Sequence, residues 1–392
     1  MAKRIGLIGD DAVAHAAKQC DVDVVAAYPI TPQTLMVETF SQFVANGEVD
    51  TEFVCVESEH SAISACVAAS LSGARVFTAT ASQGIALMHE VLYAASGCRC
   101  PIVMGVANRA LSAPINIHCD HSDVMGSRDS GWIQIFVENA QEAYDTTIQA
   151  FKLAEDPEIL LPVMVNLDGF IISHSMEGVI MLEDEEVKAF LPPREIVYKL
   201  DPEKPITIGP VALPDYYYEF KYQQADAMSK VPEKLKRIDR EYAQLTGRRY
   251  GLIQTYGMRD AETAIVCMGS TAGTARTVAK TLRREGKKVG LIKVRLYRPF
   301  PTGMIVKATR RLKALAVMDR AASLGAPGGP LYSDLKTALY GLDRKPLIFN
   351  VIYGLGGRDI TPTEIAEIFD QTLTVAKKGK VTEPVTYMGV RE

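Results

Sequence analysis

The chain has 392 residues, of which 47% are hydrophobic, and carries 43 basic against 47 acidic residues. This length predicts two to three domains with sizeable cores. The near balance of charge excludes the basic field of a nucleic-acid-binding protein, and the sequence has no apolar run of about eighteen residues that could span a bilayer. Because the apolar stretch at the N-terminus is too short for a signal peptide, we expect a cytoplasmic protein with no nucleic-acid or membrane partner.

Seven cysteines are scattered along the chain, and no two have the C-x-x-C spacing of zinc or iron–sulfur ligands. An odd number in an intracellular chain predicts free thiols. Cys98 and Cys100 flank one arginine, which is poor geometry for chelation. The run from His118 to Asp123 (HCDHSD) contains residue types that ligate metals. Because its consecutive side chains point in different directions, we favour hydrogen bonding within a loop and predict no metal site in this chain.

In the first half of the chain, apolar β-branched runs alternate with helical patterns. Strands buried on both faces are predicted at 23–27, 52–56, 75–79, 101–107 and 160–167, and helices at about 32–45, 58–72, 84–96 and 140–154. This alternation is typical of an α/β fold with a doubly wound parallel sheet. Thr31 followed by Pro32 fits a helix N-cap with proline at the first helical position, and Gly47 and Gly73 stand where helices should end.

The alternation lapses over 176–250, where we predict an extension with a helix near 221–245 that lies on the surface or against a partner. It then resumes, with strands at 263–269, 288–294, 314–319 and 347–353 and helices at 272–285, 302–312 and 330–341. We therefore predict a first domain over 1–250, including the extension at 176–250, and a smaller α/β domain over 255–392.

Four short polar segments stand where buried runs end: Tyr28–Pro32, Glu57–Ala62, Thr80–Gly84 and Asn108–Ile115. Ligands of open parallel sheets bind outside the carboxyl ends of the strands, so these segments predict one binding crevice.

Individual residues of these segments have structural alternatives. Thr31 can simply cap a helix. Glu59 can complement the dipole of a helix that starts at Ser58, or it can act as a tuned hydrogen-bond acceptor in a crevice of low dielectric. Arg109 follows a buried strand, and its planar guanidinium group can form two parallel hydrogen bonds to a carboxylate. An internal salt bridge and a substrate clamp are equal alternatives for Arg109.

Several ordered motifs carry a resemblance that covers nearly the whole chain. They are YPITP, ESEHSA, TATASQG, NRALSAPINI, DHSD, RDSGW at 128–132, NLDGF at 166–170, DR at 319–320 and GGPLY at 328–332. Together they resemble the α subunit of the multi-subunit 2-oxoacid:ferredoxin oxidoreductases, closest to those that act on pyruvate. The resemblance implies a thiamine-diphosphate-binding-like parallel sheet and a smaller domain like the C-terminal domain of transketolase. It also implies the reversible conversion of pyruvate and coenzyme A to acetyl-CoA and CO2, with electrons passed to ferredoxin, in anaerobic metabolism.

The same resemblance implies that this chain supplies the aminopyrimidine side of a thiamine diphosphate site shared with a partner subunit. Glu59 matches the glutamate that hydrogen-bonds the pyrimidine ring and favours the imino tautomer, which removes the thiazolium C2 proton. The residues Pro29, Ile30 and Gln83 would lie beside the cofactor.

The substrate residues are implied in the same way. Arg109 and Thr31 match the residues that hold the carboxylate and carbonyl oxygen of the oxoacid. The loop at 111–116 would lie beside the substrate, with Leu111, Ser112, Ala113, Pro114 and Asn116. One departure is His118, where relatives often have an aromatic residue.

Motifs that the chain lacks also fit the resemblance. The family binds the magnesium diphosphate with a G-D-G segment and a downstream asparagine, and this chain has neither that pattern nor cluster cysteines. The resemblance therefore places Mg2+ and the [4Fe-4S] clusters in β-, γ- and δ-type partner subunits. It also implies that the second domain makes contacts with other subunits and takes no part in the chemistry.

The substrate is open between two kinds of 2-oxoacid. One cation for one carboxylate suits pyruvate and argues against a dianion, since Thr31 and Ser112 add no charge. A branched 2-oxoacid remains an alternative. A noncatalytic assembly subunit and the transketolase-like half of a 2-oxoacid dehydrogenase are rival hypotheses of other kinds.

Overall fold

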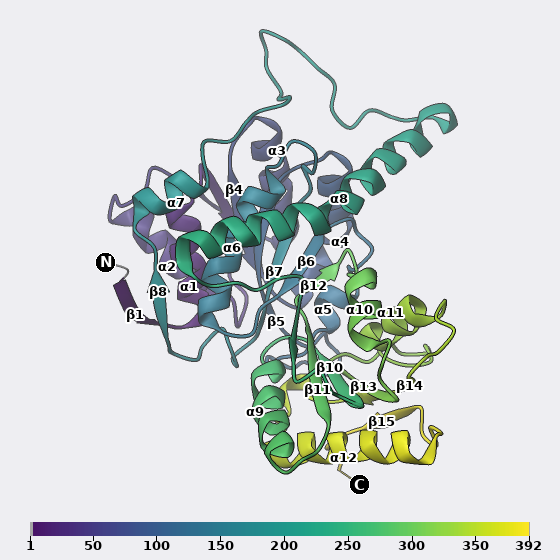
Figure 1. Cartoon of the computed structure of the whole chain (residues 1–392). Helices are drawn as coiled ribbons and strands as arrows, with labels where there is room; N and C mark the ends of the chain where they lie inside the picture. The colour runs from purple at the N-terminus through teal and green to yellow at the C-terminus, as the bar shows by residue number, and fades with distance from the viewer. Residues whose placement is uncertain (1–2, 392) are drawn as a thin grey trace.

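The computed structural model describes residues 3–391, and its larger sheet has seven strands in the order β12-β6-β7-β5-β4-β2-β3 (Figure 1). Neighbouring strands are parallel except for β12, which pairs antiparallel with β6. The strands are β2 (Val24–Ala27), β3 (Glu52–Cys55), β4 (Val76–Thr80), β5 (Ile102–Asn108), β6 (Ile133–Phe136), β7 (Val163–Asp168) and β12 (Leu296–Arg298).

Helices cover both faces of this sheet. Along β2, Val25 and Ala27 belong to one buried core, while Ala26 belongs to another on the opposite face. Alternate residues therefore pack into different cores, which is why the strands read as continuous apolar runs. The helices of this part are α1 (Gly9–Gln19), α2 (Thr34–Ala45), α3 (Glu59–Leu71), α4 (Gln83–Gly97), α5 (Ser122–Met125) and α6 (Ala140–Ala154).

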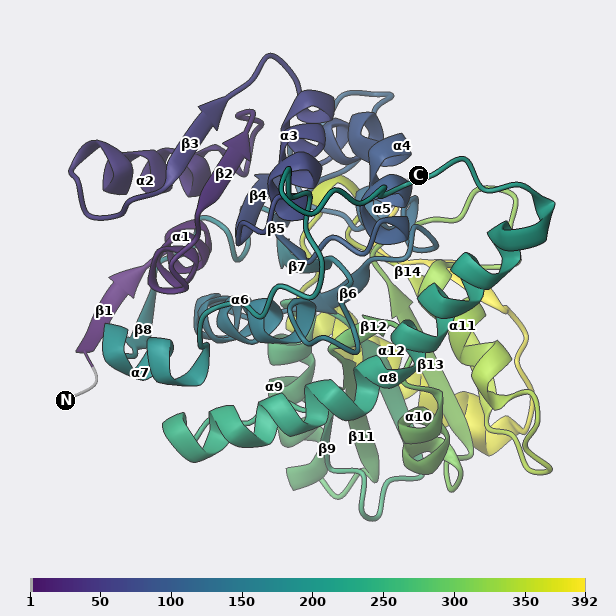
Figure 2. The same ribbon diagram turned by 90° about the horizontal axis from the view of Figure 1, so that it is seen from above.

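The predicted extension contributes one strand of a small two-stranded sheet and a long helix. Strand β1 (Lys3–Leu7) pairs antiparallel with β8 (Glu177–Met181), and α7 (Asp184–Phe190) follows. Helix α8 (Pro214–Thr246) is longer than the helix predicted near 221–245 and ends at Gly247 in the left-handed conformation. It runs past α6, and its first turns project from the body beside a long loop (Figures 1 and 2).

The C-terminal part forms a six-stranded sheet in the order β15-β14-β13-β10-β11-β9, parallel except where β9 meets β11. Its strands are β9 (Ile253–Tyr256), β10 (Thr263–Cys267), β11 (Val289–Val294), β13 (Ala314–Asp319), β14 (Leu347–Ile352) and β15 (Val385–Tyr387). Its helices are α9 (Thr271–Arg284), α10 (Thr302–Thr309), α11 (Pro330–Leu339), the 3-10 turn η1 (Leu355–Gly357) and α12 (Pro362–Lys378). The predicted class, two α/β units with largely parallel sheets, is confirmed.

Some local predictions are confirmed and one is wrong. Gly47 and Gly73 follow α2 and α3 with positive φ, as expected for residues beyond a helix end. The predicted cap at Thr31 is wrong, because α2 begins only at Thr34 and its N-cap position is Gln33. The intervening residues form a turn in which the main-chain N–H of Gln33 donates to Ile30 O. The domain division at 250–255 stays a prediction. One strand crosses it, because β12 follows that boundary in the sequence but lies in the first sheet.

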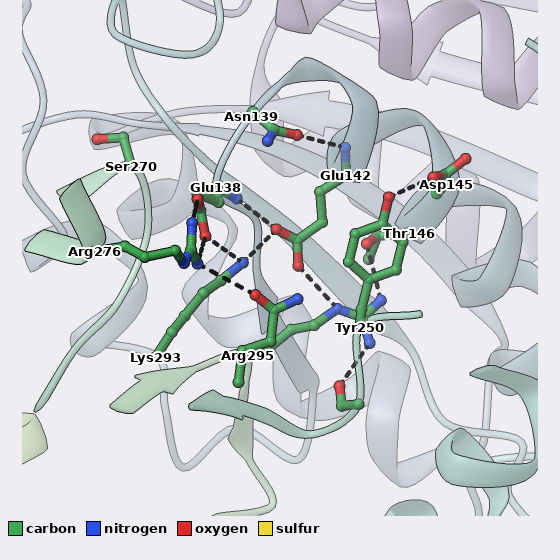
Figure 3. Close-up of polar contacts among 12 residues, drawn as sticks. Glu138, Asn139, Glu142, Asp145, Thr146, Tyr250, Ser270, Arg276, Lys293 and Arg295 are labelled. Atoms are coloured by element: carbon green, nitrogen blue, oxygen red, sulfur yellow. Dashed lines mark hydrogen bonds and ion pairs between the residues drawn. The ribbon is translucent and has the colours of Figure 1, made fainter. Parts of the chain in front are cut away.

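A buried ionic cluster joins the two parts of the chain (Figure 3). Lys293 of β11 is 1% exposed and pairs with Glu138, at 3.2 Å, and with Glu142 of α6. Arg276 of α9 makes two hydrogen bonds to Glu138, at 2.5 and 2.8 Å, and Arg295 lies 3.2 Å from Glu142. Since buried charges are tolerated only when they are paired, this cluster fixes how the second sheet sits against the first.

Candidate active site

The four polar segments meet at one edge of the larger sheet. Strands β2, β3, β4 and β5 are parallel, so their carboxyl ends lie on the same side. Tyr28–Pro32 follows β2, Glu59 follows β3, Gln83 follows β4 and Arg109 follows β5. The structure therefore brings the predicted site residues together.

Glu59 lies in the first turn of α3, where Ser58 caps the helix by accepting a hydrogen bond from the main-chain N–H of Ser61. The predicted helix start at Ser58 is confirmed. Glu59 is 6% exposed, and its carboxylate has no hydrogen-bond or ion-pair partner among residues 3–391. A carboxylate at a helix N-terminus gains from the dipole, but one so deeply buried is costly without a hydrogen-bond donor. Glu59 is thus an acceptor that a ligand could satisfy.

Gly84, in the first turn of α4, keeps open the space beside Glu59. A Cβ atom at Gly84 would lie 2.2 Å from Thr80 Oγ1 and 2.9 Å from Glu59 Oε1. The Thr80 hydroxyl is buried and has no hydrogen-bond partner in the described part of the chain. Two unsatisfied oxygens therefore lie beside a glycine whose replacement would displace them.

Arg109 is a buried cation without a carboxylate partner. It is 6% exposed, its Nε donates to Asn116 O at 2.8 Å, and its Nη1 donates to Thr31 O at 2.9 Å. Among residues 3–391 its guanidinium forms no ion pair, and burial lowers the pKa of Arg109 despite the opposing effect of Asp123. The internal salt bridge considered from the sequence is therefore not what the structure shows.

Asp123 anchors the ends of two strands of the site. Its Oδ2 accepts the main-chain N–H groups of Ser82, at 3.0 Å, and of Arg109, at 2.9 Å. Its Oδ1 accepts Asn108 Nδ2 and the N–H of Val124. Burial raises the pKa of Asp123 to about 6, against these hydrogen bonds. One carboxylate thus sets the main-chain position of both the β4–α4 turn and Arg109.

The other expected cofactor and substrate residues surround these groups. Gln83 Nε2 donates to Ser112 Oγ at 2.6 Å, which ties the start of α4 to the 111–116 loop. The N–H of Ile30 donates to Gln33 Oε1 at 3.1 Å, and Pro29 beside it is exposed. Thr31 is exposed and enters the site through its main-chain oxygen.

The 111–116 loop is held at its two ends and exposed between them. The N–H of Leu111 donates to Ser122 Oγ at 3.2 Å. Ser112, Ala113 and Pro114 are exposed. Asn116 turns its side-chain amide toward the second domain, where it donates to Gly356 O at 3.0 Å.

The HCDHSD run forms hydrogen bonds on both sides of the domain interface. Cys119, His121 and Asp168 offer ligand atoms within 4.8 Å of one another. Arg320 occupies the same neighbourhood: its Nη1 lies 2.8 Å from Asp168 Oδ2, while His121 Nε2 lies 2.8 Å from Oδ1. Burial alone would raise the pKa of Asp168, but His121 and Arg320 outweigh it and hold the pKa below its usual range. The cluster already contains its own cation, and the absence of a metal site stays a prediction.

Two motifs of the second domain have structural roles. Asp319 of the DR pair accepts hydrogen bonds from the main-chain N–H groups of Leu331 and Tyr332, at 2.8 and 3.1 Å. It thereby satisfies two N–H groups in the first turn of α11 that have no partner within the helix. Gly329 of GGPLY lies so near that a Cβ atom there would be 2.3 Å from Asp319 Cγ. His118, noted as a departure, packs against Phe170 with a ring separation of 5.1 Å.

Sequence reasoning missed the anchoring role of Asp123 and the contact of Gly356 with the 111–116 loop. Asp123 stood within the HCDHSD run and was assigned only a general hydrogen-bonding role. Gly356 lies in a glycine-rich run, and nothing near it in the sequence indicates a partner 240 residues away.

Comparison with known proteins identifies the family of this chain. Residues 15–240 match the family "Pyruvate flavodoxin/ferredoxin oxidoreductase, thiamine diP-bdg", and residues 261–365 match "Pyruvate:ferredoxin oxidoreductase core domain II". The chain belongs to the pyruvate:ferredoxin oxidoreductase family, within the 2-oxoacid:ferredoxin class of oxidoreductases. The resemblance noted from the sequence motifs is confirmed.

The relatives share nearly the full length of the chain. Pyruvate synthase subunit PorA of Thermotoga maritima is 50% identical and covers 100% of this chain and 99% of its own. The subunit of the same name from Methanocaldococcus jannaschii is also 50% identical over 93% of each chain. Ketoisovalerate oxidoreductase subunit VorA of Pyrococcus horikoshii is 44% identical over 97% of this chain and 96% of its own.

Two solved structures share the fold at low sequence identity. The 2-oxoglutarate:ferredoxin oxidoreductase from Magnetococcus marinus matches with a TM-score of 0.73 at 20% identity, covering 95% of this chain and 66% of that one. A split-gene transketolase chain matches with a TM-score of 0.56 at 14% identity, covering 95% of this chain and 100% of that one. None of the helices in residues 3–391 has the length and apolarity needed to cross a bilayer.

Proposed function

We propose that this chain is the pyruvate-binding subunit of a pyruvate synthase and holds the aminopyrimidine side of a shared thiamine diphosphate site. The reaction joins the acetyl group of pyruvate to coenzyme A, releases CO2 and passes two electrons to ferredoxin. One observation carries the proposal. Arg109 is a buried guanidinium without a carboxylate partner, at the same sheet edge as the buried, unpartnered Glu59.

The residues around Glu59 fit the ring side of this cofactor. When bound, thiamine diphosphate supplies the carbon nucleophile and electron sink that decarboxylation of a 2-oxoacid needs. The Glu59 carboxylate would accept a hydrogen bond from a ring nitrogen and hold its proton there. Gly84 leaves space beside that carboxylate, and Pro29, Ile30 and Gln83 would border the ring. Desolvation at this buried site strengthens the hydrogen bond that Glu59 accepts.

Arg109 would bind the substrate carboxylate. A guanidinium has five N–H groups, and two of them are used by Asn116 O and Thr31 O. The remaining N–H groups are available for a bidentate contact with a carboxylate. The exposed loop from Ser112 to Pro114 would border the same substrate, with Leu111 at its start. Thr31 would lie beside the carbonyl oxygen.

The single clamp favours a monocarboxylate 2-oxoacid, and relatives named for pyruvate synthase reach 50% identity. A branched 2-oxoacid is the second candidate, because a relative named for ketoisovalerate is 44% identical over nearly the whole chain. In a noncatalytic assembly subunit, a buried carboxylate and a buried guanidinium that form no ion pair in residues 3–391 would have no function.

The proposal includes the partners that the resemblance implied. The β-, γ- and δ-type subunits would supply Mg2+ and the [4Fe-4S] clusters, and ferredoxin would accept the electrons. The relatives' names support part of this, since each is called a subunit. A cytoplasmic location and a role in anaerobic metabolism belong to the same proposal. All seven cysteines are free thiols, as is usual in a reducing compartment.

The test is a substrate screen with the complete enzyme, purified together with its native partner subunits. Coenzyme A-dependent reduction of viologen is measured with pyruvate, 2-oxoisovalerate and 2-oxoglutarate. We expect the highest kcat/KM with pyruvate. A higher value with 2-oxoisovalerate would establish the second candidate, and no reduction with any 2-oxoacid by an intact complex would support an assembly subunit.

A further inference from the structure

We propose that the second domain positions the substrate clamp: the turn from Gly354 to Gly357 holds Asn116, and Asn116 holds Arg109. The inference rests on the proposed role of Arg109 and gives the second domain a part in substrate binding. Asn116 and the turn are positioning residues in this proposal, because none of them would touch the substrate's carboxylate.

Asn116 is held on both sides by hydrogen bonds. Its main-chain oxygen accepts Arg109 Nε at 2.8 Å. Its side-chain Nδ2 donates to Gly356 O at 3.0 Å, and its Oδ1 accepts the N–H of His118 at 2.6 Å. The direction of the carbonyl that orients the guanidinium is therefore set by a contact with the second domain.

The turn approaches the loop so closely that only glycine fits. Gly354, Gly356 and Gly357 all have positive φ, at 66°, 60° and 80°. A Cβ atom at Gly356 would lie 2.5 Å from Asn116 Nδ2, and one at Gly357 would lie 2.3 Å from His118 Cβ. Main-chain hydrogen bonding adds to this contact, since the N–H of Gly357 donates to Cys119 O at 2.6 Å.

The second domain is itself firmly held. The turn follows β14, a strand in the interior of the six-stranded sheet. On one side, the cluster of Lys293 and Arg276 with Glu138 and Glu142 anchors that domain to α6 (Figure 3). On the other, the N–H of His121 donates to Arg320 O at 2.8 Å. A rigid support lets a turn of one domain fix a side chain of the other, and a misplacement of about 1 Å is enough to weaken a site of this kind.

The test compares Gly356→Ala and Asn116→Ala with Gly379→Ala in the complete enzyme. Gly379 ends α12 of the same domain with φ of 69°, and a Cβ atom there meets nothing within 4 Å. The control alanine therefore carries the same backbone strain without the contact. Asn116→Ala removes the amide, introduces no clash and keeps the main-chain carbonyl, so it remains informative if Gly356→Ala fails to fold.

We expect both test variants to raise the apparent KM for pyruvate by about 2- to 12-fold, the scale of one ordinary hydrogen bond, because they act on Arg109 only through Asn116. The KM for coenzyme A and the kcat at saturating pyruvate should stay within about twofold of the wild type. Gly379→Ala should change none of these values. Equal behaviour of Gly356→Ala and Gly379→Ala, or an Asn116→Ala variant with the wild-type KM for pyruvate, would overturn the inference.

The same assays separate this inference from the proposed function. If Arg109→Lys leaves the KM for pyruvate unchanged, the clamp itself is wrong and the inference falls with it. If Arg109→Lys raises that KM and Asn116→Ala does not, the clamp stands and only the positioning role is lost.

Discussion

Replacing Arg109 by lysine keeps the positive charge and removes the planar fork. In the structure the guanidinium holds two carbonyl oxygens, Asn116 O through Nε and Thr31 O through Nη1, and still has N–H groups left for a ligand. A lysine ammonium has three N–H groups at one atom, so it cannot satisfy both carbonyls and also present two parallel hydrogen bonds to a carboxylate.

The expected loss follows from those contacts. A hydrogen bond between charged groups contributes about 1.5 to 3 kcal/mol, and the variant loses at least one such bond to the substrate. That range corresponds to a weakening of apparent pyruvate affinity by about 10- to 150-fold. Assembly and cofactor content should not change, because the main-chain N–H of residue 109 still donates to Asp123 Oδ2.

The assay is the pyruvate dependence of coenzyme A-dependent viologen reduction by the complete enzyme, with subunit content measured on the same preparation. Arg259→Lys is the matched control, since Arg259 is exposed in the second domain and should leave the KM for pyruvate unchanged. A lysine variant at 109 that binds pyruvate normally would refute the clamp. One that fails to assemble would show that Arg109 is structural.

Three further results are expected. Glu59→Gln should leave assembly intact and lower kcat by roughly 10²-fold or more, because a positioned proton-transfer group is lost. A near-normal kcat would show that Glu59 only stabilises the dipole of α3. Since the pKa of Asp123 is about 6, lowering the pH through 6 protonates a carboxylate that accepts the N–H groups of Ser82 and Arg109. The KM for pyruvate should therefore rise below pH 6. Asp123→Asn should show a raised KM that no longer changes with pH in this range; a variant whose KM still rises below pH 6 as in the wild type would contradict this. Lys293→Met removes the ammonium that two buried carboxylates share, while Arg276 and Arg295 stay beside them, so urea unfolding of the full chain should show a loss of about 1 to 3 kcal/mol. Lys313→Met removes one partner of an exposed pair and should lower the free energy of unfolding far less; equal losses would contradict the reasoning.

Strands β2, β4, β5 and β7 could be located from the sequence because each is an apolar run buried on both faces. Strand β3 was located in the same way, but the prediction that it is buried is wrong, because it is the edge strand of the sheet and Glu52 and Cys55 are exposed. The positions of Glu59 and Arg109 followed from that, since both come directly after such strands. Helix α12 was missed although it has a capping box between Thr361 and Glu364, a signal that could have been used. Strand β6 was missed because the buried Gln134 interrupts its apolar run.

The partners of the site residues could not be found from local patterns. Thr31 looked like a helix cap because it precedes a proline, but a turn closed by Gln33 delays the helix to Thr34. Arg109 was expected to meet a carboxylate or a substrate, and its two protein partners are main-chain oxygens, which any residue type provides. Pairings of this kind depend on how the loops pack and not on side-chain identity.

Strand β12 gives this chain a particular order of folding. Leu296 pairs with Ile135 and Arg298 with Gln134, so the strand that closes the first sheet is made about 160 residues after the strand it covers. During synthesis on the ribosome, β6 stays an open edge until that segment emerges, with main-chain groups ready to pair with another chain. A fragment cut at residue 250 would keep that edge permanently. The first sheet is therefore complete only when much of the second has been translated.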